Sequence, residues 1–172
     1  MKTKNLVQNE VYLYFAPDYK TAQYVEFLGY WENNDVCIFC LKNNDMRLTK
    51  QQVRTCIFDA SNEISELCED VLNVARNNPN GFTYNLLTEA KETSGYSVAY
   101  AATQNNSNDF KKAVKHALLH RGIVGGWIDS ETNTIYIDSV KILHDKNMAI
   151  EVGKHEKQIA IFCLDEMTEI RL

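Results

Sequence analysis

The sequence is poor in the residues that form long flexible connections, since its 172 residues include two prolines and seven glycines. We therefore expect folded regions that follow one another closely, without an extended linker. No stretch approaches the ~20 apolar residues that cross a bilayer. The N-terminal stretch MKTKNLVQNE also lacks the apolar segment of a signal peptide. These absences predict a cytoplasmic protein with no membrane partner.

An excess of basic residues is also missing. The chain has 18 Lys and Arg against 23 Asp and Glu, which gives a formal net charge of −5, and neither half is basic. Domains that bind nucleic acids normally present a basic surface to the phosphate backbone. We therefore expect no nucleic-acid partner.

The cysteines and histidines do not form a recognisable metal site. Cys37 and Cys40 have the CxxC spacing, but they lie in the strand-like run VCIFCL, where residues three apart point to opposite faces. His116 and His120 share one helix face, yet no third ligand is evident. The cysteine number, five, is odd, which favours reduced thiols in a reducing compartment. We expect no metal and no cofactor.

The first third of the chain alternates short apolar runs with polar turns, which is typical of β-structure. We expect a small SH3-like β module over residues 1–60, followed over 61–80 by a connecting helix and a short linker. The helix is predicted over 61–77, because its apolar residues recur at helical spacing and Pro79 and Gly81 follow. The strands are predicted at 11–15, 24–31, 36–41 and 46–49.

Residues 81–172 show strands and helices in the order β-α-β-β-α-β, which is typical of a ferredoxin-like antiparallel sheet with two helices. The inner strands of such a sheet would be 95–102 and 134–140, and 82–87 would add a further strand. The predicted fold class for the whole chain is therefore α+β.

A pair of glycines interrupts one predicted strand directly before a tryptophan. Glycine inside a strand costs roughly 0.5–1 kcal/mol relative to alanine, which indicates a compensating need. We interpret Gly125, Gly126 and Trp127 as a notch that contacts a ligand or partner, and expect Gly126→Val to leave the melting temperature nearly unchanged. The alternative is a β-bulge with a buried Trp127. The candidate binding residues are Thr103, Gln104, Asn105, Gly125, Gly126 and Trp127.

Three carboxylates flank the predicted turn between the strands 123–129 and 134–140. A pair of carboxylates can support acid–base chemistry, but acids beside a turn are usually solvated, and we interpret Asp129, Glu131 and Asp138 in that way. The sequence contains no GxSxG, P-loop or GxGxxG motif. No catalytic residue is assigned.

Five segments of the second half carry a resemblance to a known group: GFTYNL, SGYSVAYAATQN, GIVGGWIDSETNTIYIDSV, AIEVGKHEKQIAIF and EIRL. Over about residues 81–172 the chain resembles a domain of bacteriophage and mobile-element proteins for which no activity is established. Relatives continue after the TQN segment with Ser-Phe-Gly, whereas this chain continues with Asn106-Ser107-Asn108. The resemblance implies a phage or mobile-element origin.

These observations favour a non-enzymatic accessory protein of a phage that binds a host or phage protein. It would act as an inhibitor of a host system or as a component of the virion. We expect it in the host cytoplasm or in the virion. The alternative function is an enzyme or binding protein for a nucleotide or another small ligand, acting at the Gly125–Trp127 notch.

Overall fold

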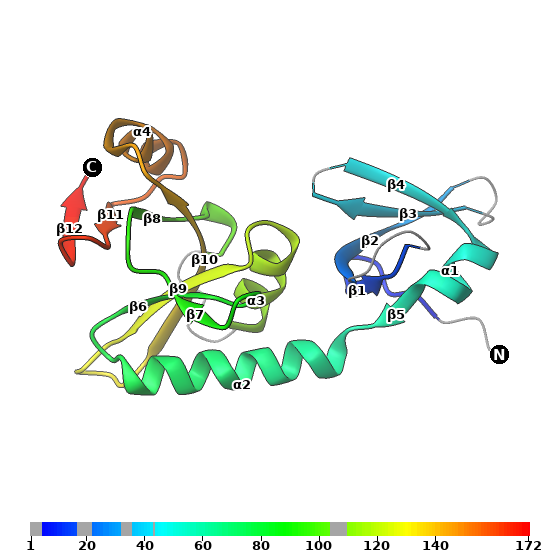
Figure 1. The fold of residues 1–172 in the computed structure, drawn as a ribbon, viewed down its shortest axis with the longest axis horizontal. Helices are drawn as coiled ribbons and strands as arrows, with labels where there is room; N and C mark the ends of the chain where they lie inside the picture. The colour runs from blue at the N-terminus through cyan, green and yellow to red at the C-terminus, as the bar shows by residue number, and fades with distance from the viewer. Residues whose placement is uncertain (1–4, 17–21, 32–35, 43, 104–109) are drawn as a thin grey trace. The chain divides into compact units, whose positions relative to one another are not determined.

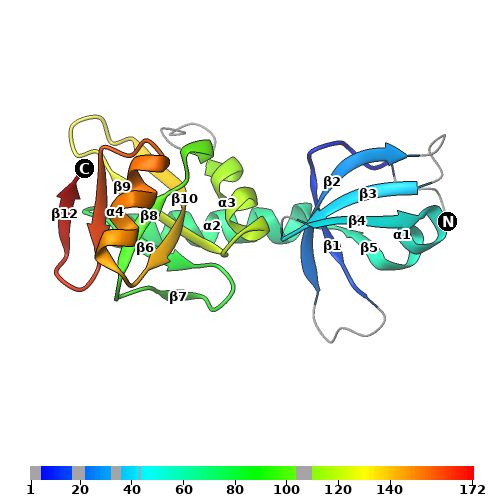
Figure 2. The same cartoon turned by 90° about the horizontal axis from the view of Figure 1, so that it is seen from above.

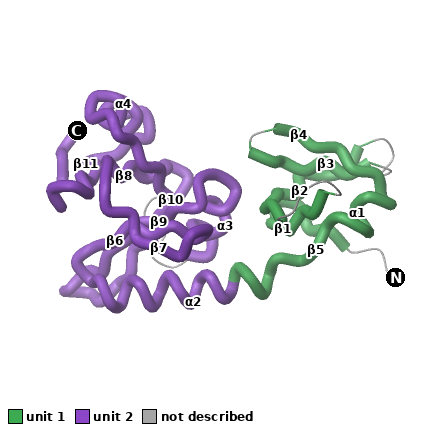
Figure 3. The backbone as a smooth tube through the Cα atoms, viewed as in Figure 1, with its two compact units in different colours: residues 1–64 green, residues 65–172 purple. Residues whose placement is uncertain are grey.

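The computed structural model describes residues 5–16, 22–31, 36–42, 44–103 and 110–172. Two compact units make up the chain, residues 1–64 and residues 65–172 (Figure 3). The described residues form two antiparallel sheets, one in each unit, and four α-helices. The expected α+β class is therefore confirmed. Among these residues, no helix has both the length and the apolar character needed to cross a membrane.

The first unit contains a five-stranded sheet in the order β4-β3-β2-β1-β5 (Figure 1). A short helix, α1, precedes the last strand, which returns to pair with β1. The buried core of this unit includes Val25, Phe27, Phe39 and Ile57. The elements are β1 (Val11–Tyr14), β2 (Gln23–Trp31), β3 (Val36–Leu41), β4 (Asn44–Thr49), α1 (Lys50–Cys56) and β5 (Ile57–Asp59).

The helix predicted over 61–77 is observed as α2 (Ser61–Asn77). Its apolar stripe is buried, including Cys68, Val71 and Ala75. The helix ends where the side-chain amide of Asn78 donates to the carbonyl of Val74, at 2.7 Å. Pro79 follows directly, as expected for a residue that cannot continue a helix.

The second unit contains a seven-stranded sheet in the order β12-β11-β8-β10-β9-β6-β7 (Figures 1 and 2). The predicted inner strands are observed as β8 and β10, and they pair with each other. The strands are β6 (Phe82–Asn85), β7 (Ala90–Lys91), β8 (Tyr96–Ala99), β9 (Ile123–Ile128), β10 (Ile135–Leu143), β11 (Ala160–Cys163) and β12 (Thr168–Arg171). The helices after α2 are the 3₁₀-helix η1 (Ala101–Thr103), α3 (Phe110–Leu119) and α4 (Lys146–His155).

Helices α3 and α4 define one face of this sheet. Helix α3 packs on β9 and β10, and α4 packs on β8, β10 and β11. Val98 and Ile161 form a buried cluster with Ala149 of α4. Because neighbouring residues of a strand point to opposite faces, the residues on either side of Val98 and Ile161 point to the other face. That second face carries the candidate site.

Candidate functional site

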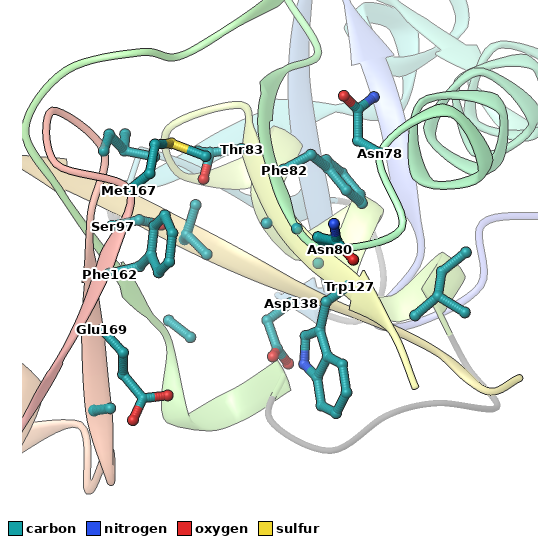
Figure 4. A pocket seen from close by; sticks show the side chains of 18 of the residues that line it. Asn78, Asn80, Phe82, Thr83, Ser97, Trp127, Asp138, Phe162, Met167 and Glu169 are labelled. Carbon is teal, nitrogen blue, oxygen red and sulfur yellow. The ribbon is translucent and has the colours of Figure 1, made fainter. Parts of the chain in front are cut away.

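A cavity of about 890 Å³ lies against the sheet of the second unit (Figure 4). The strand register explains its composition. Residues opposite each other in an antiparallel pair share a face, and Ser97 pairs with Phe162, while Ala99 pairs with Val140. These residues line the cavity and alternate with Val98 and Ile161, which pack with α4. The cavity is therefore on the face opposite the helices.

Small side chains make this face hollow. On this face, five lining residues of β6, β8, β9 and β11 have side chains no larger than threonine, and larger side chains surround them. Figure 4 shows Trp127 beside Asp138, with Phe162 and Glu169 on the other side of the cavity. A cavity of this size falls in the range of small-molecule sites, roughly 300–1,000 Å³. The small residues are Thr83, Ser97, Ala99, Gly125 and Ala160.

Asp138 is the most unusual group in the cavity. It lies on β10 directly opposite Gly125 of β9, so its side chain points to the cavity face. Burial raises the pKa of Asp138 to about 6. Its Oδ1 atom is buried and has no hydrogen-bond partner among the described residues. A buried, unsatisfied carboxylate oxygen is costly, and perturbed carboxylates of this kind concentrate at functional sites.

Three other charged groups of the cavity are engaged in contacts of their own. Glu92 accepts a hydrogen bond from the side chain of Asn85 at 2.9 Å. Glu169 forms an ion pair with Arg171 at 3.1 Å, and the ammonium of Lys91 donates to Asn78.

Asp129 is satisfied by the hairpin turn itself. Its carboxylate accepts the backbone N–H groups of Glu131 and Thr132, at 2.8 and 3.1 Å. The hydrogen bond from Thr132, followed by that from Glu131, lowers the pKa of Asp129. Asp138, on the same hairpin, differs from Asp129 because its Oδ1 has no partner among the described residues and burial raises its pKa.

The structure places Gly125, Gly126 and Trp127 together in the lining of the cavity. The register of β9 against β10 runs without a bulge from Val124 to Ile128. Trp127 stacks on Tyr136 with ring centroids 4.9 Å apart and an angle of 16° between the rings. The indole remains 49% exposed, so the buried tryptophan of the alternative interpretation is not observed.

The two glycines have different surroundings. A Cβ atom at Gly125 would meet the Cγ1 of Val140 at 3.1 Å, and the hydroxyl of Ser97 at 3.8 Å. A Cβ atom at Gly126 would lie 2.3 Å from the carbonyl oxygen of Tyr136. Close packing against the neighbouring strand therefore requires glycine at position 126. The expectation that Gly126→Val leaves the melting temperature unchanged is wrong for this physical reason.

The polar segment after β8 is only partly described. Thr103 is fully buried and is not among the cavity-lining residues. Its hydroxyl accepts the backbone N–H of Ser139 at 3.0 Å and donates to the carbonyl of Tyr100 at 3.3 Å. These bonds fasten η1 to β10. Gln104 and Asn105 lie outside the described residues.

A second polar cluster lies at the end of β8. His116 and His120 stack with ring centroids 4.0 Å apart, and the ring of Tyr100 packs against both. The ammonium of Lys141 lies 4.2 Å from the centre of the Tyr100 ring and pairs with Glu156 at 2.6 Å. Burial, followed by the neighbouring His120, lowers the pKa of His116 to about 4.

Within the described part of the chain, no group of three or more His, Cys, Asp or Glu residues could hold a metal ion. None of the five cysteines forms a disulfide, and Cys37, Cys68 and Cys163 are buried. Cys37 and Cys40 lie in β3, as the strand-like pattern predicted.

Asp138 is the site residue that the sequence interpretation missed. It was grouped with Asp129 and Glu131 as a solvated acid beside a turn, but its Oδ1 is buried. The signal was present in the stretch IYIDSV, where an acid stands inside an apolar strand. Period-two alternation places Asp138 on the same face as Tyr136 and Val140, and opposite the small residue Gly125.

Comparison of the chain with protein-family models, with curated proteins and with solved structures gave no match in any of the three.

Proposed function

We propose that residues 65–172 bind a small organic molecule in the cavity on the open face of the seven-stranded sheet. The observation that carries this proposal is Asp138, which lines a cavity of about 890 Å³ and whose buried Oδ1 atom has no hydrogen-bond partner among the described residues. A ligand in the cavity that donates a hydrogen bond would give the carboxyl group of Asp138 a partner. Of the two functions considered from the sequence, this is the small-ligand alternative at the Gly125–Trp127 notch.

The lining supports this proposal. Small-molecule sites are mostly apolar, with a few polar groups that fix orientation. Phe82, Phe162 and Trp127 supply apolar and aromatic surface, and Ser97, Thr83 and Asp138 supply hydroxyl and carboxyl groups. The site is built on strands of one sheet, which hold these side chains in fixed positions.

The experiment is a ligand screen read out by thermal stabilisation, because a molecule that binds only the folded protein raises its melting temperature. We expect fragments or cell extracts to stabilise the wild-type protein and to lose this effect in Trp127→Ala. The matched control is Trp31→Ala. The two tryptophans are 49% and 47% exposed, and both lie in strands, but Trp31 belongs to the first unit. Equal losses in both variants, or stabilisation by no compound, would contradict the proposal.

The accessory role in a phage, exerted through protein binding, is a second proposal and concerns the first unit. Exposed aromatic side chains of this unit support it: Phe15 and Phe58 pack edge to face at 5.3 Å, and Arg47 lies 4.9 Å from the centre of the Trp31 ring. Tryptophan and arginine are frequent at interaction hot spots. Capture of one defined protein from phage-infected cells by the wild type, and its loss in Trp31→Ala but not in Trp127→Ala, is the expected result. Equal capture by both variants would count against it.

The detailed fold assignments also belong to this proposal. The order β11-β8-β10-β9 supports a ferredoxin-like unit, in which the first and third strands of the motif lie in the centre. In the first unit, the return of β5 to β1 after a short helix supports an SH3-like module.

A further inference from the structure

We infer that the ligand of the cavity is a planar organic cation whose N–H groups donate to the carboxylate of Asp138. This inference rests on the proposed small-molecule binding and names the chemical class that the site selects. Three features of the cavity carry it: the sign of its charge, the unmet acceptor, and an aromatic platform next to that acceptor.

The charge of the lining favours a cation. The charged lining residues are Lys91, Glu92, Asp129, Glu131, Asp138 and Glu169. Five carboxyl groups therefore face one ammonium group, which already donates to Asn78. An anionic ligand would meet like charges, and desolvation would increase the repulsion. A cation gains from the same field.

The carboxylate of Asp138 determines which hydrogen-bonding group the ligand must carry. Glu92, Asp129 and Glu169 have partners within the protein, whereas the Oδ1 atom of Asp138 has none among the described residues. A charged N–H donor forms a shorter and stronger bond to a carboxylate than a neutral donor does. Amidine-like groups add a second parallel N–H, which matches the two carboxylate oxygens.

The stacked rings of Trp127 and Tyr136 favour a ligand of flat shape. Trp127 pairs with Tyr136, and Gly125 pairs with Asp138, so the indole and the carboxylate are diagonal neighbours on one face. Cations bind the faces of tryptophan and tyrosine rings through the ring quadrupole. Gly125, which lines the cavity and pairs with Asp138, has no side chain, and a glycine in a strand lets a flat ligand approach the backbone closely.

The test uses three probes of nearly equal shape: benzamidine, which is cationic, benzamide, which is neutral, and benzoate, which is anionic. Binding is followed by amide and indole N–H chemical shifts of the full chain. The chain has two tryptophans, so Trp31 in the first unit provides an internal reference for Trp127. We expect benzamidine to shift the resonances of Trp127 and Gly125, and to bind at least about tenfold more tightly than benzamide at pH 7.5. Benzoate should bind most weakly.

Two variants separate the role of Asp138 from the general field of the cavity. Asp138→Asn should abolish the preference for benzamidine over benzamide. Glu169→Gln, which removes a carboxylate paired with Arg171, should retain that preference. Lowering the pH below about 6, where the pKa of Asp138 lies, should weaken benzamidine binding in the wild type. The other charged groups of the lining, from Lys91 to Glu169 as named above, are common to the wild type and Asp138→Asn, so their difference isolates Asp138.

The outcomes distinguish this inference from the proposed function. Benzamide or benzoate binding the cavity as tightly as benzamidine would overturn the inference and leave small-molecule binding standing. Equal effects of Asp138→Asn and Glu169→Gln would overturn it too. If none of the three probes shifts a cavity resonance, both the inference and the proposed function fail.

Discussion

Asp138→Asn is expected to make the ligand-free protein more stable at neutral and alkaline pH. The folded protein holds this carboxylate in a buried position, where burial raises its pKa from 3.8 to about 6. Ionisation is therefore less favourable in the folded state than in the unfolded state. Asparagine has nearly the same shape and avoids this cost, because it carries no charge.

The size of the effect follows from the pKa change. One pKa unit corresponds to about 1.4 kcal/mol, so a shift of about two units gives roughly 3 kcal/mol as an upper limit. The side chain retains some contact with solvent, which screens the effect, and we expect about 1–2 kcal/mol at pH 8. For a unit of this size, that corresponds to an increase in melting temperature of roughly 4–10 °C.

The pH dependence of unfolding provides a second check on the sign of the stability difference between Asp138→Asn and the wild type. Below pH 3.8 the carboxyl is protonated in both states, and the two proteins should be equally stable. As the pH rises from 3.8 through 6, the folded wild type retains a proton that the unfolded chain has lost, and the wild type loses stability relative to Asp138→Asn. Urea unfolding of both proteins between pH 4 and 8 measures this difference.

Asp129→Asn is the matched control on the same hairpin. Asp129 accepts two backbone N–H groups, and its pKa is lowered. Its replacement should therefore destabilise the protein at pH 8. If Asp138→Asn is less stable than the wild type at pH 8, or the difference does not depend on pH, the proposed environment of Asp138 is refuted.

Three further predictions concern packing, protonation and thiols. Gly126→Ala should destabilise the protein by about 1–3 kcal/mol through overpacking against the Tyr136 carbonyl. Gly125→Ala should change stability less, because its closest new contact is the Cγ1 of Val140 at 3.1 Å and its contact with backbone, the carbonyl oxygen of Phe82, is at 3.6 Å, but it should weaken ligand binding. Thermal unfolding that ranks the two variants in the opposite order would contradict this. Stability attributable to His116 should be present above pH 6.5 and be lost as the pH falls towards 4, because burial and then the neighbouring His120 lower the pKa of His116 in the folded protein. A His116→Gln variant should lose less stability than the wild type over that pH range, and an equal loss would refute the reasoning. Thiol titration of the unfolded protein should count five thiols. In the native protein Cys37, Cys68 and Cys163 should react slowly, because they are buried. Fewer than five thiols after unfolding would show a disulfide and contradict this prediction.

Local sequence patterns predicted much of the fold, because the spacing of apolar residues and the residues that end helices and strands act at short range. The helix over 61–77 has an apolar stripe and is followed by Pro79, and it is observed as α2 with the same bounds. The polar turn after Ile128 joins two strands that pair in simple register. The β-α-β-β-α-β order also predicted 95–102 and 134–140 as inner strands, and the corresponding β8 and β10 pair with each other inside the second sheet.

The cavity could be predicted only in part. The Gly125–Trp127 segment was recognised from the cost of glycine in a strand, and the structure places it in the lining. The rest of the floor comes from Thr83, Ser97 and Ala160, which lie on three other strands far apart in the sequence. Their small size has no local signature, since a serine or alanine fits many environments. The register that aligns them depends on long-range strand pairing.

The same limit explains the errors at single residues. Thr103 follows a strand and begins a polar segment, which resembles a binding loop in sequence, but its hydroxyl bonds to the backbone of β10. Gly126 and Gly125 are adjacent and identical in type. Both line the cavity, and the atoms packed against Gly126, above all the carbonyl of Tyr136, mark it as the glycine that packing requires.

Crystallographic soaking of a diverse fragment collection into the full-length protein tests the central claim most directly, because it places bound molecules without assuming their identity. We expect fragments to gather in the cavity beside Trp127, with N–H donors within hydrogen-bond distance of the carboxylate of Asp138. Fragments that bind elsewhere on the protein while this cavity stays empty would contradict it.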